Sequence, residues 1–263
     1  MSTIRDFEEA LETHLSLRSF PIAVKLIKSG EAAPTDAGRP FQDLGERITP
    51  CMGWHLARHL GLSVAMGTDD FSSECPSSVF IFGVTEPLQE WIDGDLAYGL
   101  YAANHEAART MEANVPCLAY GEYEGLVFSP LEKASFTPDL VMVYGNSRDA
   151  MRLITASAWE TGEPLRVSMA ARGLCGDGVV QAFLTGKPVL AIPCGGDRVY
   201  GGAQDDEVVF VTPVSHLEGI IAGLEAFRRA LRVDRLGGES ALHGQYLRMA
   251  ATLDRVRCSE SAR

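Results

Sequence analysis

The sequence predicts an α/β protein with a mixed sheet and flanking helices, and an α+β arrangement is the alternative. Apolar runs of strand length alternate along the chain with segments of helical periodicity, which is the pattern of α/β proteins. The 263 residues are 46% apolar, enough for a core, and they show no repeat of short period. We expect one domain over residues 1–232, or two closely packed halves (1–120 and 121–232), and a peripheral tail over 233–263.

The first half of the chain begins with a helix, because apolar residues recur at positions 7, 10, 11 and 15. Residues 29–46 are rich in Gly, Pro, Ala and Asp and are expected to form a loop. Thr49 can cap a helix that starts at Pro50 and ends at Gly61. The elements predicted in this half are helices over 7–15, 50–60 and 106–112, and strands over 21–28 and 63–66.

The second half alternates more regularly between strands and helices. Proline bounds several of its apolar runs, which is typical of buried strands. Asn146 can cap a helix that Gly162 ends, and residues 197–207 are polar enough to form a loop. The elements predicted in this half are strands over 125–130, 138–145, 165–169, 189–192 and 207–213, and helices over 147–161, 179–184 and 215–231.

The charge and the hydropathy pattern exclude several classes of protein. Lys and Arg number 23 against 35 Asp and Glu, and this formal charge of −12 disfavours nucleic-acid binding. The polar start of the chain carries no signal region, and no apolar run reaches the length of a membrane span. We therefore expect a cytoplasmic protein that meets a small-molecule substrate or a redox partner protein, with a homo-oligomer as one form of assembly. Thiols stay reduced in the cytoplasm, which favours metal, redox or catalytic roles for the six cysteines.

Residues 172–198 carry the strongest signal for a functional site. Cys175 and Cys194 stand 19 positions apart, and each precedes a glycine, which lets the backbone approach a bulky partner. Cys175 is expected near a helix N-terminus, where the pKa of a thiol falls. Cys194 is expected just after a strand, where ligands gather in α/β sheets. Buried cysteines often only pack, and that interpretation stays open for each of them.

A second set of candidate ligands lies on the helix predicted over 50–60. Cys51, His55 and His59 follow one another at intervals of four, on one face, and in principle they could ligate zinc. One helix rarely supplies three ligands to one ion, so an ordinary partly buried or surface histidine pair is the favoured interpretation. The glycine and serine motifs of nucleotide-binding proteins and serine hydrolases do not occur in the sequence.

Several blocks of residues occur in the order in which one known family has them. The blocks are residues 20–25, Thr49-Pro50-Cys51, Cys75-Pro76, residues 125–131, residues 138–141, Arg172-Gly173-Leu174-Cys175 and Cys194-Gly195-Gly196-Asp197-Arg198. Over about residues 5–231 the chain resembles the family called domain of unknown function 169. The resemblance implies a set of four cysteines, namely Cys51, Cys75, Cys175 and Cys194. The positions that fall outside the family pattern are Cys117, Cys258, His55 and His59.

The first functional hypothesis is a metal site made by these four cysteines. Their number matches the ligand count of a 4Fe–4S cluster or of a zinc site with four thiolates. None of them forms a CxxC pair, the spacing that structural zinc sites commonly use, so an iron–sulfur cluster with a redox role is favoured. Gly176 and Gly195 would offer backbone N–H groups to such a cofactor.

Two alternatives use no metal. In the first, Cys175 beside Arg172 is a nucleophile of low pKa, and Arg198 holds a substrate carboxylate. In the second, the aromatic segment 91–101 and the glycine loops line a ligand pocket or an oligomer interface, without catalysis.

Overall fold

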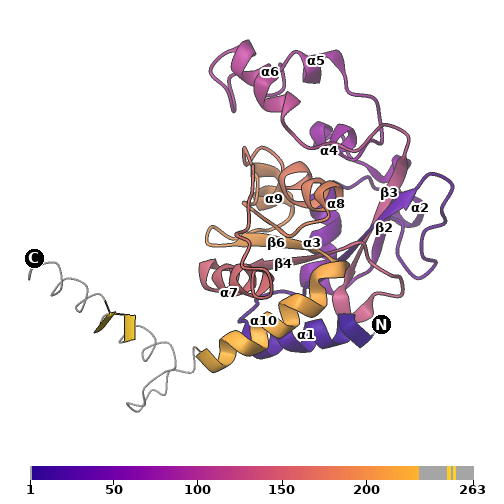
Figure 1. Cartoon of the computed structure of the whole chain (residues 1–263). Coiled ribbons are helices and arrows are strands. Elements are labelled where there is room, and N and C mark those ends of the chain that lie inside the picture. Colours follow the sequence, from indigo (N-terminus) through magenta and orange to yellow (C-terminus); the bar gives the residue numbers. More distant parts are fainter. Residues whose placement is uncertain (1, 231–247, 250, 253–263) are drawn as a thin grey trace, which may run out of the picture.

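A six-stranded sheet lies at the centre of the part of the chain that the structure describes (Figure 1). The computed structural model describes residues 2–230, 248–249 and 251–252. The strands lie in the order β2-β3-β1-β4-β6-β5. Their bounds are β1 Ile22–Lys28, β2 Val64–Gly67, β3 Tyr123–Pro130, β4 Leu140–Gly145, β5 Val189–Ala191 and β6 Val208–Pro213.

The pairings between these strands are all antiparallel. β1 lies inside the sheet, where Val24 is opposite Phe128 of β3 on one side and Leu140 of β4 on the other. The α/β class with flanking helices is confirmed, and the pairing is antiparallel where the sequence predicted a mixed sheet. Helix-bearing connections, such as the one between β5 and β6, return the chain to an antiparallel neighbour instead of crossing over to a parallel one.

Helices cover both faces of the sheet. The first face is covered by α1 (Ser2–His14), α7 (Ser147–Ser157) and α10 (Leu217–Ala230), which contact one another and lie together below the sheet in Figure 1. The second face is covered mainly by α3 (Pro50–Leu60), a π-helix (Cys175–Val180, η3) and α8 (Gln181–Thr185). The other short helices are α2 (Pro40–Leu44), α4 (Pro76–Ile81), α5 (Gln89–Ile92), α6 (His105–Ala113) and α9 (Gly195–Tyr200).

The strands bury a different apolar cluster on each face, as the alternation of side chains along a strand requires. In β4, Met142 and Tyr144 belong to the cluster beneath α3, whereas Val141 and Val143 belong to the cluster beneath α1 and α10. Cys51, Cys175 and Cys194 all belong to the cluster on the α3 face. The cysteine site therefore lies on the α3 face of the sheet.

Local signals explain where the predicted helices begin and end. The hydroxyl of Thr49 accepts a 3.2 Å hydrogen bond from the backbone N–H of Met52, and Gly61 ends α3 with a φ of 69°. Asn104 caps α6 through the N–H of Ala107 at 2.9 Å. These caps are confirmed. The structure also confirms, within a few residues, the strands predicted over 21–28, 63–66, 125–130, 138–145, 189–192 and 207–213.

Four segments differ from the prediction. Residues 165–169 form no strand, and Val167 is 41% exposed, so their apolar alternation marks no buried face. Helix α7 ends at Ser157 instead of continuing to Gly162, which leaves Trp159 at 54% exposure. Helices α2 and α9 lie where loops were predicted, because five or six residues are too few to show a helical period.

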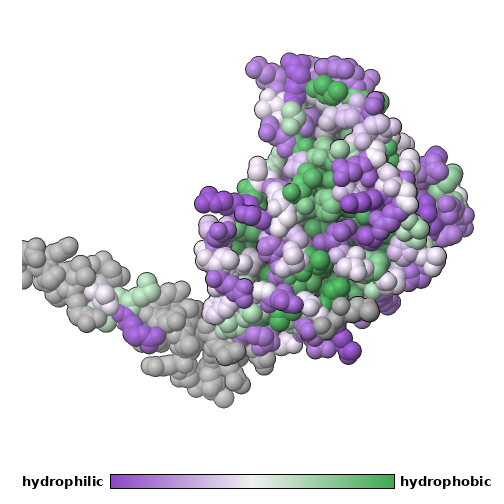
Figure 2. All heavy atoms as spheres, turned by 45° about the vertical axis from the view of Figure 1, so that its right-hand side comes forward, coloured by the Kyte–Doolittle hydropathy of each residue, from purple (hydrophilic) through white to green (hydrophobic). Residues whose placement is uncertain are grey.

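The chain between α4 and β3 leaves the sheet and forms the upper part of Figure 1, with α5 and α6. Trp91 anchors this part, since it is 5% exposed and its ring centroid lies 5.6 Å from that of Phe80. Figure 2 shows hydrophilic side chains gathered at this end and hydrophobic ones across the middle of the same face. Trp91, at the start of segment 91–101, therefore belongs to the core.

Two further findings concern the limits of the chain. No helix among the described residues combines the length and the apolar composition that crossing a membrane requires. The tail predicted over 233–263 lies outside the described residues apart from 248–249 and 251–252, and Cys258 lies outside them.

Candidate functional site

Four cysteines from four separate elements line one pocket of about 310 Å³, which we call the cysteine pocket. They are Cys51, Cys75, Cys175 and Cys194. Cys51, Cys175 and Cys194 are 1%, 3% and 8% exposed, and Cys75 is partly buried. The fold thus brings together the four cysteines that were singled out in the sequence.

The local structure that presents each sulfur is a chain turn at the beginning of a helix. Cys51 follows Pro50 in the first turn of α3, and Cys75 is the residue that precedes α4. Cys175 is the first residue of the π-helix, and Cys194 precedes α9 three positions after the end of β5. Short π-helical segments are uncommon and occur often at functional sites. The positions predicted for Cys175 and Cys194, at a helix start and after a strand, are confirmed.

The thiol of Cys51 lies between those of Cys175 and Cys194. Hydrogen bonds to Cys175 and then to Cys194, together with burial, raise the pKa of Cys51 well above its ordinary value. The same contact acts in the opposite sense on Cys194, whose pKa falls to about 5. Its sulfur accepts from the Cys51 thiol, and backbone N–H groups around it oppose the effect of burial. This arrangement favours one thiolate, at Cys194, which accepts from the Cys51 thiol and from backbone N–H groups.

Cys75 lines the same pocket, and its thiol stays protonated near neutral pH. Burial raises the pKa of its thiol to about 11, and repulsion from Cys175 and Cys194, when these are ionised, acts in the same direction. A second and a third thiolate are therefore unfavourable in the same pocket without a cation. A bound metal cation would favour the thiolate form of these cysteines instead, because metal-bound cysteines are deprotonated.

A buried carboxylate adjoins the cysteines. Asp197 is fully buried in α9 and accepts hydrogen bonds from the indole of Trp54 at 2.6 Å and from the hydroxyl of Tyr144 at 3.1 and 3.0 Å. Burial raises the pKa of Asp197 to about 7, and the charge of Cys194 adds to the rise, while the two hydrogen bonds oppose it. Asp197 is therefore a titratable group in electrostatic contact with the site.

Behind Asp197 lies a buried ion pair. The Arg58 guanidinium donates from Nη2 to both carboxylate oxygens of Glu207, at 2.7 and 2.8 Å, and stacks 3.6 Å from the ring centroid of Tyr144. Both side chains are nearly inaccessible, at 0% and 2% exposure. The pair is thus a rigid polar support beneath Tyr144 and Asp197.

The outer wall of the cysteine pocket comes from Arg172 and Tyr101. The Arg172 guanidinium lies 4.5 Å from the ring centroid of Tyr101 and donates to the buried carboxylate of Glu112 at 3.1 Å. Arg172 therefore fastens the upper part of the molecule to the segment that carries Cys175. Tyr101 lines the pocket, so segment 91–101 contributes to both core and pocket.

The structure separates the other predicted site residues. Gly195 lines the cysteine pocket, whereas Gly176 packs against Val115, with 2.6 Å between an added Cβ and the valine Cγ1. Arg198 donates to the carbonyl of Gln204 at 3.0 Å and lies near Asp205, outside the set of residues that line the pocket. Arg198 thus acts as a clamp of the loop that follows α9.

The histidines and the fifth described cysteine also lie apart from the pocket. The rings of His55 and His59 are 4.8 Å apart, and the Nδ1–H of His55 donates to the carbonyl of Gly201 at 3.0 Å. The favoured interpretation of an ordinary histidine pair fits these contacts. Cys117 donates to the Val115 carbonyl at 3.3 Å and does not line the pocket.

Most of the chain, including the cysteine pocket, matches one known family. The family described as "Uncharacterised ArCR", domain of unknown function 169, matches residues 10–223, which is most of the chain. The chain belongs to this family. An uncharacterised protein of Methanocaldococcus jannaschii is 27% identical over 233 residues, which cover 87% of this chain and 97% of that protein. No solved structure matches the chain.

The family match spans all four cysteines of the pocket, since they lie between residues 10 and 223. Sequence reasoning missed Trp54, Tyr144 and the Arg58–Glu207 pair. Trp54 stands three positions after Cys51 on α3, and this proximity was the one available signal. Arg58 and Glu207 are 149 positions apart, and no local pattern links them.

Proposed function

We propose that Cys51, Cys75, Cys175 and Cys194 ligate an iron–sulfur cluster, and that the protein uses it in a redox role toward a small molecule or an electron-transfer partner. The observation that carries the proposal is the convergence of these four cysteines on one pocket. Soft thiolates select zinc and iron–sulfur clusters among the common metal centres. Cys117, the other cysteine among the described residues, lies elsewhere.

The positions of the ligands in the chain favour a cluster over a structural zinc ion, because none of the four cysteines forms a CxxC pair. Within the described residues, no three His, Cys, Asp or Glu side chains are arranged to hold one metal ion directly. A tetrahedral zinc ion with Zn–S bonds of about 2.3 Å requires sulfurs only about 3.8 Å apart. A 4Fe–4S cluster takes each thiolate on a separate iron, so the thiols of Cys175 and Cys194, both hydrogen-bonded to Cys51, would move apart from it to hold such a cluster.

The surroundings of the pocket also fit a cluster. When bound, an iron–sulfur cluster supplies electron transfer, with a potential that depends on charge, hydrogen bonds and solvent exposure. Gly195 and Gly196 bring backbone to the pocket with little side-chain bulk. Asp197 adds negative charge next to Cys194, which would favour the oxidised form of a centre and lower its potential. Arg172 and Tyr101 restrict access from solvent at the outer wall.

The direct test is metal analysis of the full chain purified without oxygen. We expect about four iron and about four acid-labile sulfide per chain, as for one 4Fe–4S cluster. One zinc ion and no sulfide per chain would indicate a zinc site on the same thiolates in place of a cluster. A folded sample that contains neither iron, sulfide nor zinc, even after reconstitution with iron and sulfide, would end the proposal.

A reactive cysteine without metal is the second candidate, and the hydrogen-bond donors around Cys194 favour it. The Cys51 thiol and three backbone N–H groups, from Leu174, Gly196 and Asp197, stabilise a thiolate there. The sequence had assigned this role to Cys175. In metal-free protein at pH 6, iodoacetamide should then label Cys194 first, and Cys194→Ser should abolish the fast labelling. Fast labelling that survives this substitution would exclude Cys194 as the nucleophile.

A further inference from the structure

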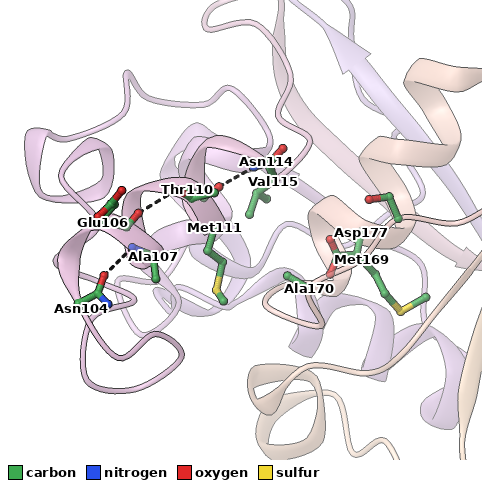
Figure 3. Close-up of a pocket in the computed structure, with 11 residues that line it drawn as sticks. Asn104, Glu106, Ala107, Thr110, Met111, Asn114, Val115, Met169, Ala170 and Asp177 are labelled. Carbon is green, nitrogen blue, oxygen red and sulfur yellow. Dashed lines mark hydrogen bonds between the residues drawn. The ribbon is translucent and has the colours of Figure 1, made fainter.

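A second cleft, of about 620 Å³, lies between α6 and the segment that leads into the π-helix (Figure 3). One wall is the face of α6 that carries Ala107, Thr110 and Met111, and the opposite wall is residues 168–170 with Asp177. Its volume falls within the range of about 300–1,000 Å³ that small-molecule sites occupy. None of the cysteines that the structure describes lines it, and it shares no lining residue with the cysteine pocket.

The two walls are held firmly at the base of the cleft. Val115 lines the cleft below α6, and it packs against Gly176, where only hydrogen fits in place of a side chain. The amide of Gln181, with its nitrogen toward the backbone, donates to the carbonyls of Ser168 at 2.9 Å and Asp177 at 2.8 Å. The wall opposite α6 is therefore fixed to the π-helix. Such prior order reduces the entropic cost of binding.

Asp177 lines this cleft and carries a buried oxygen atom without a hydrogen-bond partner among the described residues. The residue is 3% exposed, and its Oδ2 atom accepts no hydrogen bond within the described residues although it is screened from solvent. Backbone N–H groups of residues 170–172 interact with the carboxyl group and so fix its position. Buried polar atoms are nearly always paired, so an orphan acceptor at a cleft calls for a donor from outside the chain.

The chemistry of the lining selects the kind of ligand. Within the described part of the chain, Asp177 and Glu106 are the ionisable residues of the cleft, and no lysine or arginine lines it. Met111 and Met169, which Figure 3 shows on opposite walls, add flexible apolar contacts. We propose that this cleft binds a small molecule that presents an amidinium or ammonium group to Asp177 and an apolar body to the two methionines. The site does not depend on a metal in the cysteine pocket.

The two methionines allow a local test by nuclear magnetic resonance. Full-length protein carrying ¹³C-methyl methionine, eight residues in all, is titrated with benzamidine, and Met111→Leu and Met169→Leu assign the two signals. We expect saturable shifts at Met111 and Met169, and benzoate should bind at least about tenfold more weakly than benzamidine. Asp177→Asn should weaken benzamidine binding at least about tenfold, whereas the exposed Asp205→Asn should not.

A second variant keeps the test decisive if Asp177→Asn does not fold. Ala107→Trp fills the cleft from the α6 side, and Ala113→Trp adds the same bulk to the same helix outside the cleft. Benzamidine binding should be lost in the first variant and kept in the second. The proposal is overturned if benzoate binds as tightly as benzamidine, if the two methionine signals do not respond, or if Ala107→Trp leaves the affinity unchanged.

Discussion

The indole of Trp54 donates a 2.6 Å hydrogen bond to Oδ1 of Asp197, and both side chains are buried. The Tyr144 hydroxyl donates to the same carboxylate, and Cys194 lies near enough for its charge to raise the carboxyl pKa. The cysteine pocket is therefore backed by a carboxylate whose charge is set by the interior of the protein. Substitution and pH should both reveal this coupling.

Asp197 should make the pH dependence of stability unusual in metal-free protein. Burial raises its pKa to about 7, from about 3.9 in the unfolded chain, so its penalty on folding grows from pH 4 to pH 7. The pKa of Cys194 is lowered to about 5, from about 8.5 unfolded, so its stabilisation grows from pH 5 to pH 8.5. The two effects oppose each other between pH 5 and pH 7.

Asp197→Asn separates these two effects. As the pH rises from 5 to 7, the unfolding free energy of the variant should increase by about 1–3 kcal/mol, because only the effect of Cys194 is left. The unfolding free energy of the wild type should change little over the same interval. Urea unfolding of reduced, metal-free protein at several pH values measures both curves. The same pH profile in the variant and the wild type would show that Asp197 does not titrate in this range.

The buried Arg58–Glu207 pair should be needed for folding. Arg58→Met leaves the carboxylate of Glu207 buried without its partner and should lower the unfolding free energy by about 3–5 kcal/mol. Replacement of both residues by methionine should recover much of this loss, because no charge is then left unpaired. The control is Arg18→Met, which breaks the solvent-exposed pair with Asp206. A urea midpoint for Arg58→Met no lower than that of the control would contradict the assignment.

Two glycines of the predicted site should respond differently to alanine. A Cβ at Gly176 would lie 2.6 Å from Val115 Cγ1 and 3.1 Å from the Pro116 carbonyl oxygen. Gly176→Ala should therefore lose about 1–3 kcal/mol of stability through overpacking. A Cβ at Gly195 would come no closer than 3.7 Å to the Tyr101 hydroxyl, so Gly195→Ala should be tolerated. Thermal unfolding compares the two, and equal losses would argue against this packing.

The four pocket cysteines should act as one ligand set. Substitution of serine for any one of Cys51, Cys75, Cys175 and Cys194 should reduce the iron and sulfide bound per chain, because a thiolate ligand is lost. Cys117→Ser is the matched control, since Cys117 is partly buried and its thiol donates a hydrogen bond to the Val115 carbonyl outside the cysteine pocket. Iron content should stay at the wild-type value in this control. Full iron content in two or more of the four pocket variants would mean that the thiols are not the ligands.

The sequence was informative wherever a signal is local. Thr49, Asn104 and Gly61 mark helix ends through caps that need only neighbouring residues, and they lie where expected. Glycines beside Cys175 and Cys194 pointed to the pocket because they lie in two of the four turns that build it. The antiparallel pairing of the strands needed tertiary information, and so did the helix α9, which is too short to show a period.

The support of the site could not be predicted for a similar reason. Trp54 and Asp197 are 143 positions apart, and their hydrogen bond depends on α3 and α9 meeting on one face of the sheet. Arg198 was expected to bind substrate, yet a local partner, the Gln204 carbonyl, holds it in the next loop. A charged residue next to a site cannot be assigned to it from sequence alone.

Crystals grown without oxygen, measured just above the iron absorption edge, test the central proposal most directly. The anomalous difference map should show iron inside the cysteine pocket, within bonding distance of the sulfurs of Cys51, Cys75, Cys175 and Cys194. A folded chain in which this pocket contains no anomalous density, or in which the iron lies elsewhere, would contradict the proposal.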